Sequence, residues 1–244
     1  MVSLVFDIGN TFSKVAVFKE QNILWTKSYR EITESLINKI IIKFKPEVAI
    51  ISSVQNKIFL WEAVLEKQVK TLWFNYQMAK SIKNHYQNPE KLGLDRLAAV
   101  VGAHFLYPKN SNLVIDAGTC VTYDCVDEQG NYFGGSISPG LKMRFKALKY
   151  YTKKLPLIDA EVEFINNTGN NTQEAILSGV QNGLRYEAEG FIKNQVQQQN
   201  TNILLTGGDF NFFDTHLKSS IFAAYVKPEP YLVLKGLNAV IHQQ

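Results

Sequence analysis

The amino-acid sequence predicts an α/β fold built from two similar halves. Three strand-like segments, followed by alternating helical and strand-like segments, occur twice along the chain. This order is typical of layered α/β domains. Each half also opens with a strand that ends in Asp-x-Gly with a Thr soon after, once at Asp7 and once at Asp116. The repetition indicates a duplicated unit whose turns face one cleft.

The first half, residues 1–110, opens with two apolar runs that flank Gly9, Asn10 and Thr11, which are hairpin-turn residues. β-Branched and aromatic side chains in the runs favour strands. Strands are predicted at 2–8, 12–18, 22–28, 47–52 and 71–74. Helices are predicted at 31–44 and 57–69, and the polar loop NHYQNPEKLGLDR leads into an apolar helix at 97–106.

The second half, residues 111–244, follows a break near 108–111 and repeats this order. Strands are predicted at 112–116, 119–126, 131–137, 202–206 and 221–226. Helical stretches are predicted at 140–152, 172–196 and 230–242, with a short helical piece after 206.

Composition places the chain among ordinary globular proteins. Its 244 residues are 45% hydrophobic and 20% charged, with a formal net charge of +4. Its apolar runs are too short for a membrane span, and the N-terminus lacks a signal-peptide profile, so we expect a cytoplasmic protein with no membrane partner. Cys120 and Cys125 have an odd separation, which predicts opposite strand faces and disfavours a shared metal site.

A basic segment lies in the second half. No acidic residue occurs between Glu128 and Asp159, and six cations crowd the middle of this gap: Lys142, Arg144, Lys146, Lys149, Lys153 and Lys154. The segment fits either a solvated helix or an anion-binding face. No known nucleic-acid module is present, so we favour the solvated helix and expect no nucleic-acid partner.

Glycine turns at strand ends favour phosphate binding, because glycine lets backbone N–H groups approach a phosphate closely. The GxxxxGK[ST], GxGxxG and GxSxG motifs are all absent, which argues against Walker-type, Rossmann and α/β-hydrolase sites. Two Asp-Gly-Thr hairpins remain, together with a third glycine turn at Gly207 and Gly208.

Five motifs in register, DIGNTFSK, GLDR, DAGT, GGSISPG and TGG, resemble the type III pantothenate kinase family of the actin-like ATPase and sugar-kinase superfamily. The resemblance implies two ribonuclease H-like (actin-like ATPase) domains with the active site in the cleft between them. It also implies ATP-dependent phosphorylation of pantothenate to 4'-phosphopantothenate, the first step of coenzyme A biosynthesis. The implied cofactors are Mg²⁺ and a monovalent cation, K⁺ or NH₄⁺, and the implied assembly is a homodimer.

By this resemblance the first hairpin is a phosphate loop, with Lys14 facing phosphate oxygens and Asp7 helping to hold magnesium. Asp116 matches the position that binds the monovalent cation, and Thr119 matches a nucleotide contact. A strand-surface role for Lys14 and a magnesium-side role for Asp116 stay open. The predicted loop consists of Asp7, Ile8, Gly9, Asn10, Thr11, Phe12, Ser13 and Lys14.

By the same resemblance Asp95 is the general base for the pantothenate hydroxyl, and Thr172 contacts substrate, in some members from the neighbouring subunit. A simpler interpretation makes Asp95 a helix N-cap, Arg96 a surface residue and Thr172 a capping residue. The predicted substrate residues are Tyr86, Gly93, Leu94, Asp95, Arg96 and Thr172.

Two other functions fit less of the sequence. One is a sugar or amino-sugar kinase of the same superfamily, which the GLDR loop with Tyr86 disfavours. The other is a catalytically silent regulatory or nucleic-acid-binding relative, supported by the basic segment. A binding module has no need for Asp7, Lys14, Asp95, Arg96 and Asp116 together, so the sequence favours the enzyme.

Overall fold

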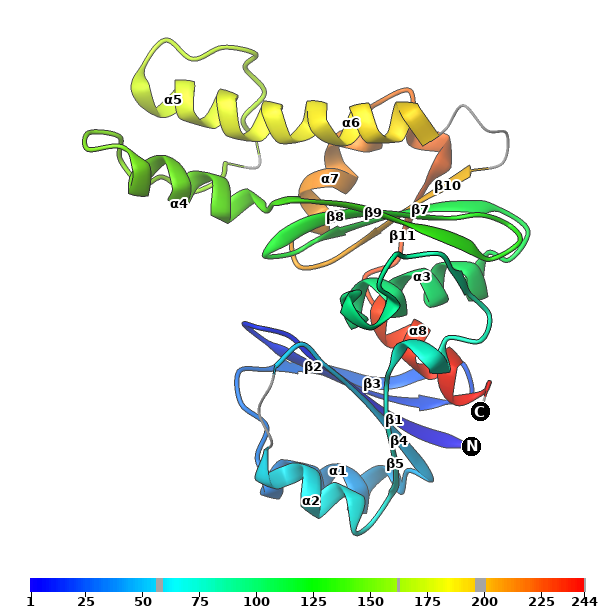
Figure 1. The fold of residues 1–244 in the computed structure, drawn as a ribbon. Coiled ribbons are helices and arrows are strands. Elements are labelled where there is room, and N and C mark those ends of the chain that lie inside the picture. The colour runs from blue at the N-terminus through cyan, green and yellow to red at the C-terminus, as the bar shows by residue number, and fades with distance from the viewer. Residues whose placement is uncertain (56–58, 162, 196–200, 244) are drawn as a thin grey trace. The chain divides into compact units, whose positions relative to one another are not determined.

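The computed structural model describes residues 1–55, 59–161, 163–195 and 201–243. The chain divides into two compact units (Figure 1). Unit 1 comprises Met1–Pro108, Gln129–Phe133 and Tyr231–Gln244, and unit 2 comprises Lys109–Glu128 and Gly134–Pro230. The predicted halves differ from these units because a short internal segment and the C-terminal segment both group with unit 1.

Unit 1 contains a five-stranded sheet with the order β3-β2-β1-β4-β5. β1 to β3 are antiparallel neighbours, whereas β4 and β5 run parallel to β1. The strands are β1 (Val2–Ile8), β2 (Ser13–Lys19), β3 (Asn22–Tyr29), β4 (Val48–Ser53) and β5 (Lys70–Trp73). Helices α1 (Glu34–Phe44) and α2 (Leu60–Glu66) cover one face of the sheet. There the rings of Phe6 and Trp61 stack with their centroids 5.0 Å apart.

Helices α3 (Leu94–Leu106) and α8 (Leu232–Ile241) pack against each other and against the opposite face of this sheet. Their backbones cross closely at glycine: a Cβ atom on Gly236 would lie 1.8 Å from the carbonyl oxygen of Ala98. On the sheet side, the Ser3 hydroxyl donates to Asn238, whose Nδ2 donates to the Glu20 carbonyl at 2.8 Å. These contacts explain why the C-terminal helix belongs to unit 1.

Three short elements lie between β5 and α3, and the last two of them reach into the predicted polar loop NHYQNPEKLGLDR. They are the 3₁₀ turns η1 (Tyr76–Met78) and η2 (Pro89–Lys91) and the two-residue strand β6 (Lys83–Asn84). β6 pairs with Asn131 and Tyr132, which also belong to unit 1. The loop is therefore ordered by a strand pairing that is distant in sequence.

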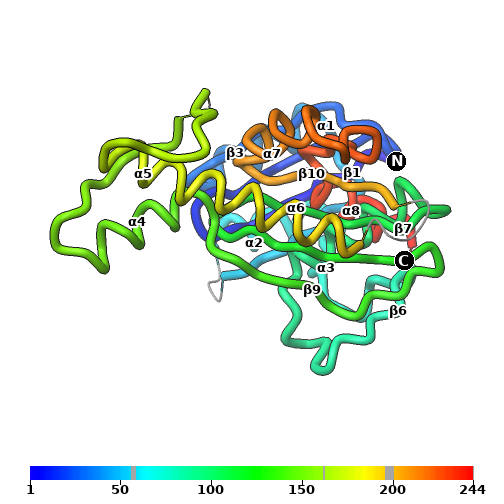
Figure 2. The backbone as a smooth tube through the Cα atoms, turned by 90° about the horizontal axis from the view of Figure 1, so that it is seen from above, coloured from blue at the N-terminus to red at the C-terminus, as the bar shows by residue number. Residues whose placement is uncertain are grey.

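The second sheet has six strands in the order β11-β10-β7-β8-β9-β6. Its strands from the second half are β7 (Ser111–Ala117), β8 (Cys120–Val126), β9 (Asn131–Pro139), β10 (Thr201–Thr206) and β11 (Val226–Pro228). The helices that contribute to the core on one face of this sheet are α4 (Leu141–Tyr151), α5 (Thr172–Leu177), α6 (Gly183–Gln195) and α7 (Phe210–Leu217). Figures 1 and 2 show α4 and α5 side by side.

The predicted order of strands and helices is confirmed, with local corrections. The helix predicted at 172–196 is α5, a π-helical stretch η3 (Ser178–Asn182) and α6. The strand predicted at 221–226 is wrong: a 3₁₀ turn, η4 (Ala223–Tyr225), occupies it and β11 starts at Val226. The Ser220 hydroxyl accepts from Phe222 N at 3.1 Å, which favours a turn over an extended backbone.

Two predicted helix ends, at 57 and 196, lie outside the described residues. Among the residues that the structure describes, no helix has both the length and the apolar character needed to cross a membrane.

Candidate active site

The β1–β2 hairpin brings the first predicted phosphate loop to one end of the unit 1 sheet. Gly9 N donates to Phe12 O at 3.2 Å and closes the turn, and Asn10, Thr11 and Phe12 are exposed. Asp7 lies directly opposite Lys14 in the strand pair. Opposed residues share a sheet face, so the Asp7 carboxylate and the Lys14 ammonium lie on the same face of the hairpin. Ile8 and Ser13, by contrast, are buried.

The neighbouring strand β4 adds a polar side chain to the same face. Ser52 pairs with Asp7 across the parallel β1–β4 ladder, and its hydroxyl is buried with no hydrogen-bond partner among the described residues. A buried hydroxyl normally has a partner. Ser52 is therefore a polar group beside this hairpin that the sequence did not single out.

The GLDR motif forms the start of helix α3. Gly93 is the N-cap, Leu94 is the first helical residue, and Asp95 lies in the first turn, where its Oδ1 accepts from Arg96 N at 2.8 Å. Arg96 is buried, with 7% of its surface exposed. The simpler interpretation is therefore wrong on both counts: Asp95 does not occupy the N-cap, and Arg96 is not a surface residue.

Tyr86 follows β6 in unit 1 and is half-buried. Its backbone N–H donates to Asn84 Oδ1 at 3.0 Å. The preceding His85 ring stacks on Phe133 with centroids 4.5 Å apart, and its Nε2 lies 3.2 Å from Asn131 Oδ1. The strand pairing of β6, the stack and these two hydrogen bonds fix the backbone that carries Tyr86.

In unit 2 three glycine motifs meet at the end of β7. The second hairpin closes through Gly118 N donating to Cys120 O at 2.9 Å, and Gly140 N donates to Thr119 O at 3.1 Å. Gly207 has φ +95, and a Cβ there would lie 2.5 Å from Asp116 Oδ1. The DAGT, SPG and TGG turns thus contact one another directly, and only glycine permits this closeness.

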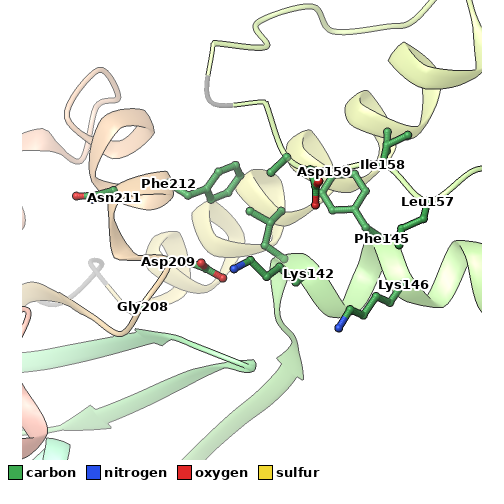
Figure 3. Close-up of a pocket in the computed structure, with 12 residues that line it drawn as sticks. Lys142, Phe145, Lys146, Leu157, Ile158, Asp159, Gly208, Asp209, Asn211 and Phe212 are labelled. Atoms are coloured by element: carbon green, nitrogen blue, oxygen red, sulfur yellow. The ribbon is translucent and has the colours of Figure 1, made fainter. Parts of the chain in front are cut away.

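A pocket of about 340 Å³ opens beside these turns (Figure 3). Its walls come from the start of α4, residues 157–160 and the start of α7. The Asp209 carboxylate and the Lys142 ammonium face each other at its edge, and Phe145 and Phe212 supply apolar walls. Burial raises the pKa of the Asp209 carboxyl, and the charge of Lys142 opposes that rise.

A polar network holds the β9–α4 turn of the GGSISPG motif against α6. Arg144 donates to Pro139 O through Nε at 2.8 Å, to Ser138 Oγ at 2.8 Å, and to the Glu187 carboxylate. Glu187 also accepts from Tyr123 Oη at 3.0 Å. Burial, followed by the charge of Glu187, raises the pKa of the Tyr123 hydroxyl. The sequence did not single out Glu187, which ties together β8, β9 and α4.

Thr172 is the first residue of α5. Asn171 is the N-cap and accepts from Glu174 N at 3.0 Å, so the alternative capping role of Thr172 is wrong by one residue. Thr172 lines a mostly apolar groove of about 700 Å³ together with residues of α4, including Ala147 and Leu148.

The cysteines are free thiols, and burial raises the pKa of Cys125 to about 11. Within the described ranges no three His, Cys, Asp or Glu side chains cluster as a metal site. A hard cation here would therefore need oxygen ligands beyond protein carboxylates, such as backbone carbonyls, phosphates and water.

Similarity to known proteins identifies the family of this chain. The family model for type III pantothenate kinase matches residues 3–194. A type III pantothenate kinase of Bacteroides fragilis (strain YCH46) is 41% identical, over 99% of this chain and 98% of its own length. This chain belongs to the type III pantothenate kinase family. A relative from Cytophaga hutchinsonii, with the same name, is 39% identical over 99% of both chains.

Family membership confirms the predicted activity, ATP-dependent phosphorylation of pantothenate in coenzyme A biosynthesis. Solved structures confirm the fold class. A putative N-acetylmannosamine kinase from Listeria monocytogenes superimposes with a TM-score of 0.59 at 14% identity, covering 100% of this chain and 99% of that one. MreB5 of Spiroplasma citri superimposes with a TM-score of 0.51 at 9% identity, covering 98% and 95%. At these identities the likeness concerns the fold alone, so the sugar-kinase alternative gains no support.

Proposed function

We propose that this pantothenate kinase transfers the terminal phosphoryl group of ATP to the pantothenate hydroxyl with Asp95 as general base. The observation that carries the proposal is the start of α3, where a half-buried carboxylate lies next to a buried arginine. A base must accept a proton while it is held in place. The Arg96 N–H holds one oxygen of Asp95, and the helix N-terminus stabilises its negative charge.

The two hairpins are proposed to bind the phosphates of ATP. In phosphoryl transfer the protein mainly positions the reactants and offsets their charge. Lys14 supplies a positive charge beside Asp7 in the first hairpin, and Thr119 supplies a hydroxyl in the second. Asp7 fits a role in holding Mg²⁺ through water, since a lone carboxylate with phosphate oxygens is a usual magnesium environment. The bound Mg²⁺ would neutralise charge on the phosphate oxygens.

The pocket beside the TGG turn is proposed to take the base and ribose of the nucleotide. It lies within unit 2 next to the second hairpin, and it pairs aromatic walls with a facing acid and base. Flat apolar walls suit a purine ring, and a few polar groups at the edge fix its orientation. Asp209 and Lys142 are the candidates for the ribose and polar contacts.

Asp116 is proposed to hold the monovalent cation. This residue is the last but one of β7, and its carboxylate lies against the glycine turn at Gly207. A Cβ on Gly207 would also lie 2.3 Å from the carbonyl oxygen of Ala117, so a backbone oxygen and the Asp116 carboxylate face the same turn. This donor chemistry fits K⁺ or NH₄⁺.

The homodimer is proposed from the apolar surface of α4 and the segment after it. Tyr150 and Tyr151 are 81% and 82% exposed, and Leu157 and Ile165 are exposed as well. Exposed apolar patches of this kind mark interaction surfaces. A second copy of the chain is the proposed partner, and Thr172 would contribute to the neighbouring subunit's substrate site.

The test is coupled turnover of the purified chain with ATP and pantothenate, alongside N-acetylmannosamine and glucose as competing acceptors. Production of ADP and 4'-phosphopantothenate with pantothenate alone supports the proposal. Faster turnover with either sugar, or turnover that needs no pantothenate, contradicts it.

A further inference from the structure

The turn that follows β4 holds the tip of the first phosphate hairpin. Ser52 and Ser53 pair with Asp7 and Ile8, and Val54 N then donates to Ile8 O at 3.1 Å. The strand pairing therefore continues past the end of β4. The next residue, Gln55, reaches back to the hairpin, and its Nε2 donates to Gly9 O at 2.6 Å.

Gln55 is itself fixed by a local turn. The Ser53 hydroxyl accepts from Gln55 N at 3.1 Å and donates to Gln55 O at 3.1 Å. A serine hydroxyl can do both at once. The backbone of Gln55 is thus anchored one strand away from the hairpin, and its half-buried side chain spans the gap.

The contact engages the one glycine of the hairpin tip. Both backbone polar groups of Gly9 are used: its N–H bonds to Phe12 O, and its carbonyl accepts from Gln55. Glycine has the widest choice of backbone conformation, so a peptide group at Gly9 would otherwise reorient easily. The bond from Gln55 therefore holds the peptide group that leads into the exposed residues Asn10 and Thr11 in one orientation.

We propose that Gln55 is a positioning residue for nucleotide binding, which keeps the phosphate hairpin in its binding conformation before ATP arrives. The inference rests on the proposed role of this hairpin in binding phosphates. Preorganisation raises affinity because less order remains to be imposed on binding. Gln55 also lines a pocket of about 740 Å³ with Trp61 and Phe59, so a simple packing role is the competing explanation.

The test compares Gln55→Ala and Gln55→Glu with a matched control, Gln68→Ala. Glutamate keeps the size of Gln55 but cannot donate to the Gly9 carbonyl when ionised. Gln68 lies in the same unit, is exposed, and donates to Val64 O at 3.2 Å, away from the hairpin. Three quantities are measured: Mg-ATP affinity without pantothenate by calorimetry, KM for each substrate, and hydrogen exchange of residues 9–14 without ligand.

Loss of one hydrogen bond to a carbonyl should weaken Mg-ATP binding about two- to tenfold in Gln55→Ala. Gln55→Glu should weaken it more, because two oxygens then face each other. Hydrogen exchange of residues 9–14 should become faster, and KM for pantothenate should stay within about twofold of the wild-type value. Gln68→Ala should match the wild type in all three measurements.

Unchanged ATP affinity in both Gln55 variants would overturn the inference. An equal rise in both KM values together with a lower melting temperature would also overturn it, since this is the signature of packing loss. Failure of the proposed function looks different: the wild-type chain would then bind Mg-ATP with the same dependence on Gln55 and yet leave pantothenate unphosphorylated.

Discussion

Asp95 and Arg96 lie in the first turn of helix α3, and this position determines their surroundings. Gly93 takes the N-cap position, so Asp95 is free of the capping role and keeps an oxygen available beyond its bond to Arg96 N. Arg96 points into the protein, where a planar guanidinium can offer several fixed hydrogen bonds. The sequence Gly-Leu-Asp-Arg therefore places a carboxylate and a buried guanidinium at the same helix end.

The first prediction concerns Asp95. Asn keeps the size of the side chain and can accept from Arg96 N, but it cannot take up the substrate proton. Asp95→Asn should fold and bind ATP normally and lose turnover by about a hundred- to ten-thousand-fold. Steady-state kinetics with ATP affinity as the control checks this. Near-normal turnover would remove Asp95 as the base and direct the search to another carboxylate.

The second prediction concerns Asp116. If its carboxylate holds a monovalent cation beside the nucleotide phosphates, turnover should rise sharply when K⁺ or NH₄⁺ replaces Na⁺ at equal ionic strength. Asp116→Asn keeps the shape of the turn and should abolish most of this difference. Equal rates of the wild-type protein in all three salts would contradict the assignment.

At the scale of elements, the packing of α3 on α8 decides how the substrate motif is supported. Gly102 and Gly236 let the two backbones cross, because any Cβ there would meet a carbonyl oxygen of the other helix. α8 begins well over a hundred residues after α3 ends. The helix that carries Asp95 is thus braced by the end of the chain.

The third prediction tests this brace. Gly236→Ala places a Cβ 1.8 Å from Ala98 O, which forces the helices apart. We expect a loss of about 1–3 kcal/mol in the free energy of unfolding, measured by urea denaturation. Gly190→Ala is the matched control: it lies in α6 with no atom within 4 Å of the added Cβ, and it should be neutral or stabilising by up to about 1 kcal/mol. Equal effects at both sites would contradict the close crossing.

The elements that could be predicted from the sequence are those whose signal is local. β1 and β2 read as strands because apolar residues fill both and turn residues separate them. The grouping of α8 with unit 1 could not be predicted, because it depends on a glycine contact with a distant helix. The strand expected at 221–226 failed because the aromatic residues Phe222 and Tyr225 lie in a turn that Ser220 stabilises.

The same distinction holds for the site. Asp7, Asp95 and Asp116 stand in motifs, and those motifs predict them as site residues. Gln55 carries no motif, since its bond to Gly9 exists only through the pairing of β4 with β1. Asp209 could be predicted from the sequence, because it directly follows the TGG turn, whose glycines the sequence analysis identifies.

At the scale of the whole molecule, α4 and α5 form an arm that carries the proposed dimer interface. One side of the arm packs into the unit 2 core through Phe145 and Ile176. Tyr150 and Tyr151 remain exposed, next to the groove lined by Thr172. A single chain therefore leaves an apolar surface exposed, and this surface is the proposed contact with a second chain.

The last prediction relates the proposed dimer to pantothenate binding. The wild-type protein should sediment with twice the 27.7 kDa mass of one chain, and Tyr150→Glu/Tyr151→Glu should sediment as a monomer because charges would be buried in the interface. If Thr172 serves the neighbouring subunit, this monomer should bind ATP normally but show a raised KM for pantothenate. Lys149→Ala/Lys153→Ala/Lys154→Ala is the control on the same exposed segment, and it should remain dimeric with turnover within a few-fold of wild type. A monomeric variant with an unchanged KM for pantothenate would instead assign Thr172 to its own subunit.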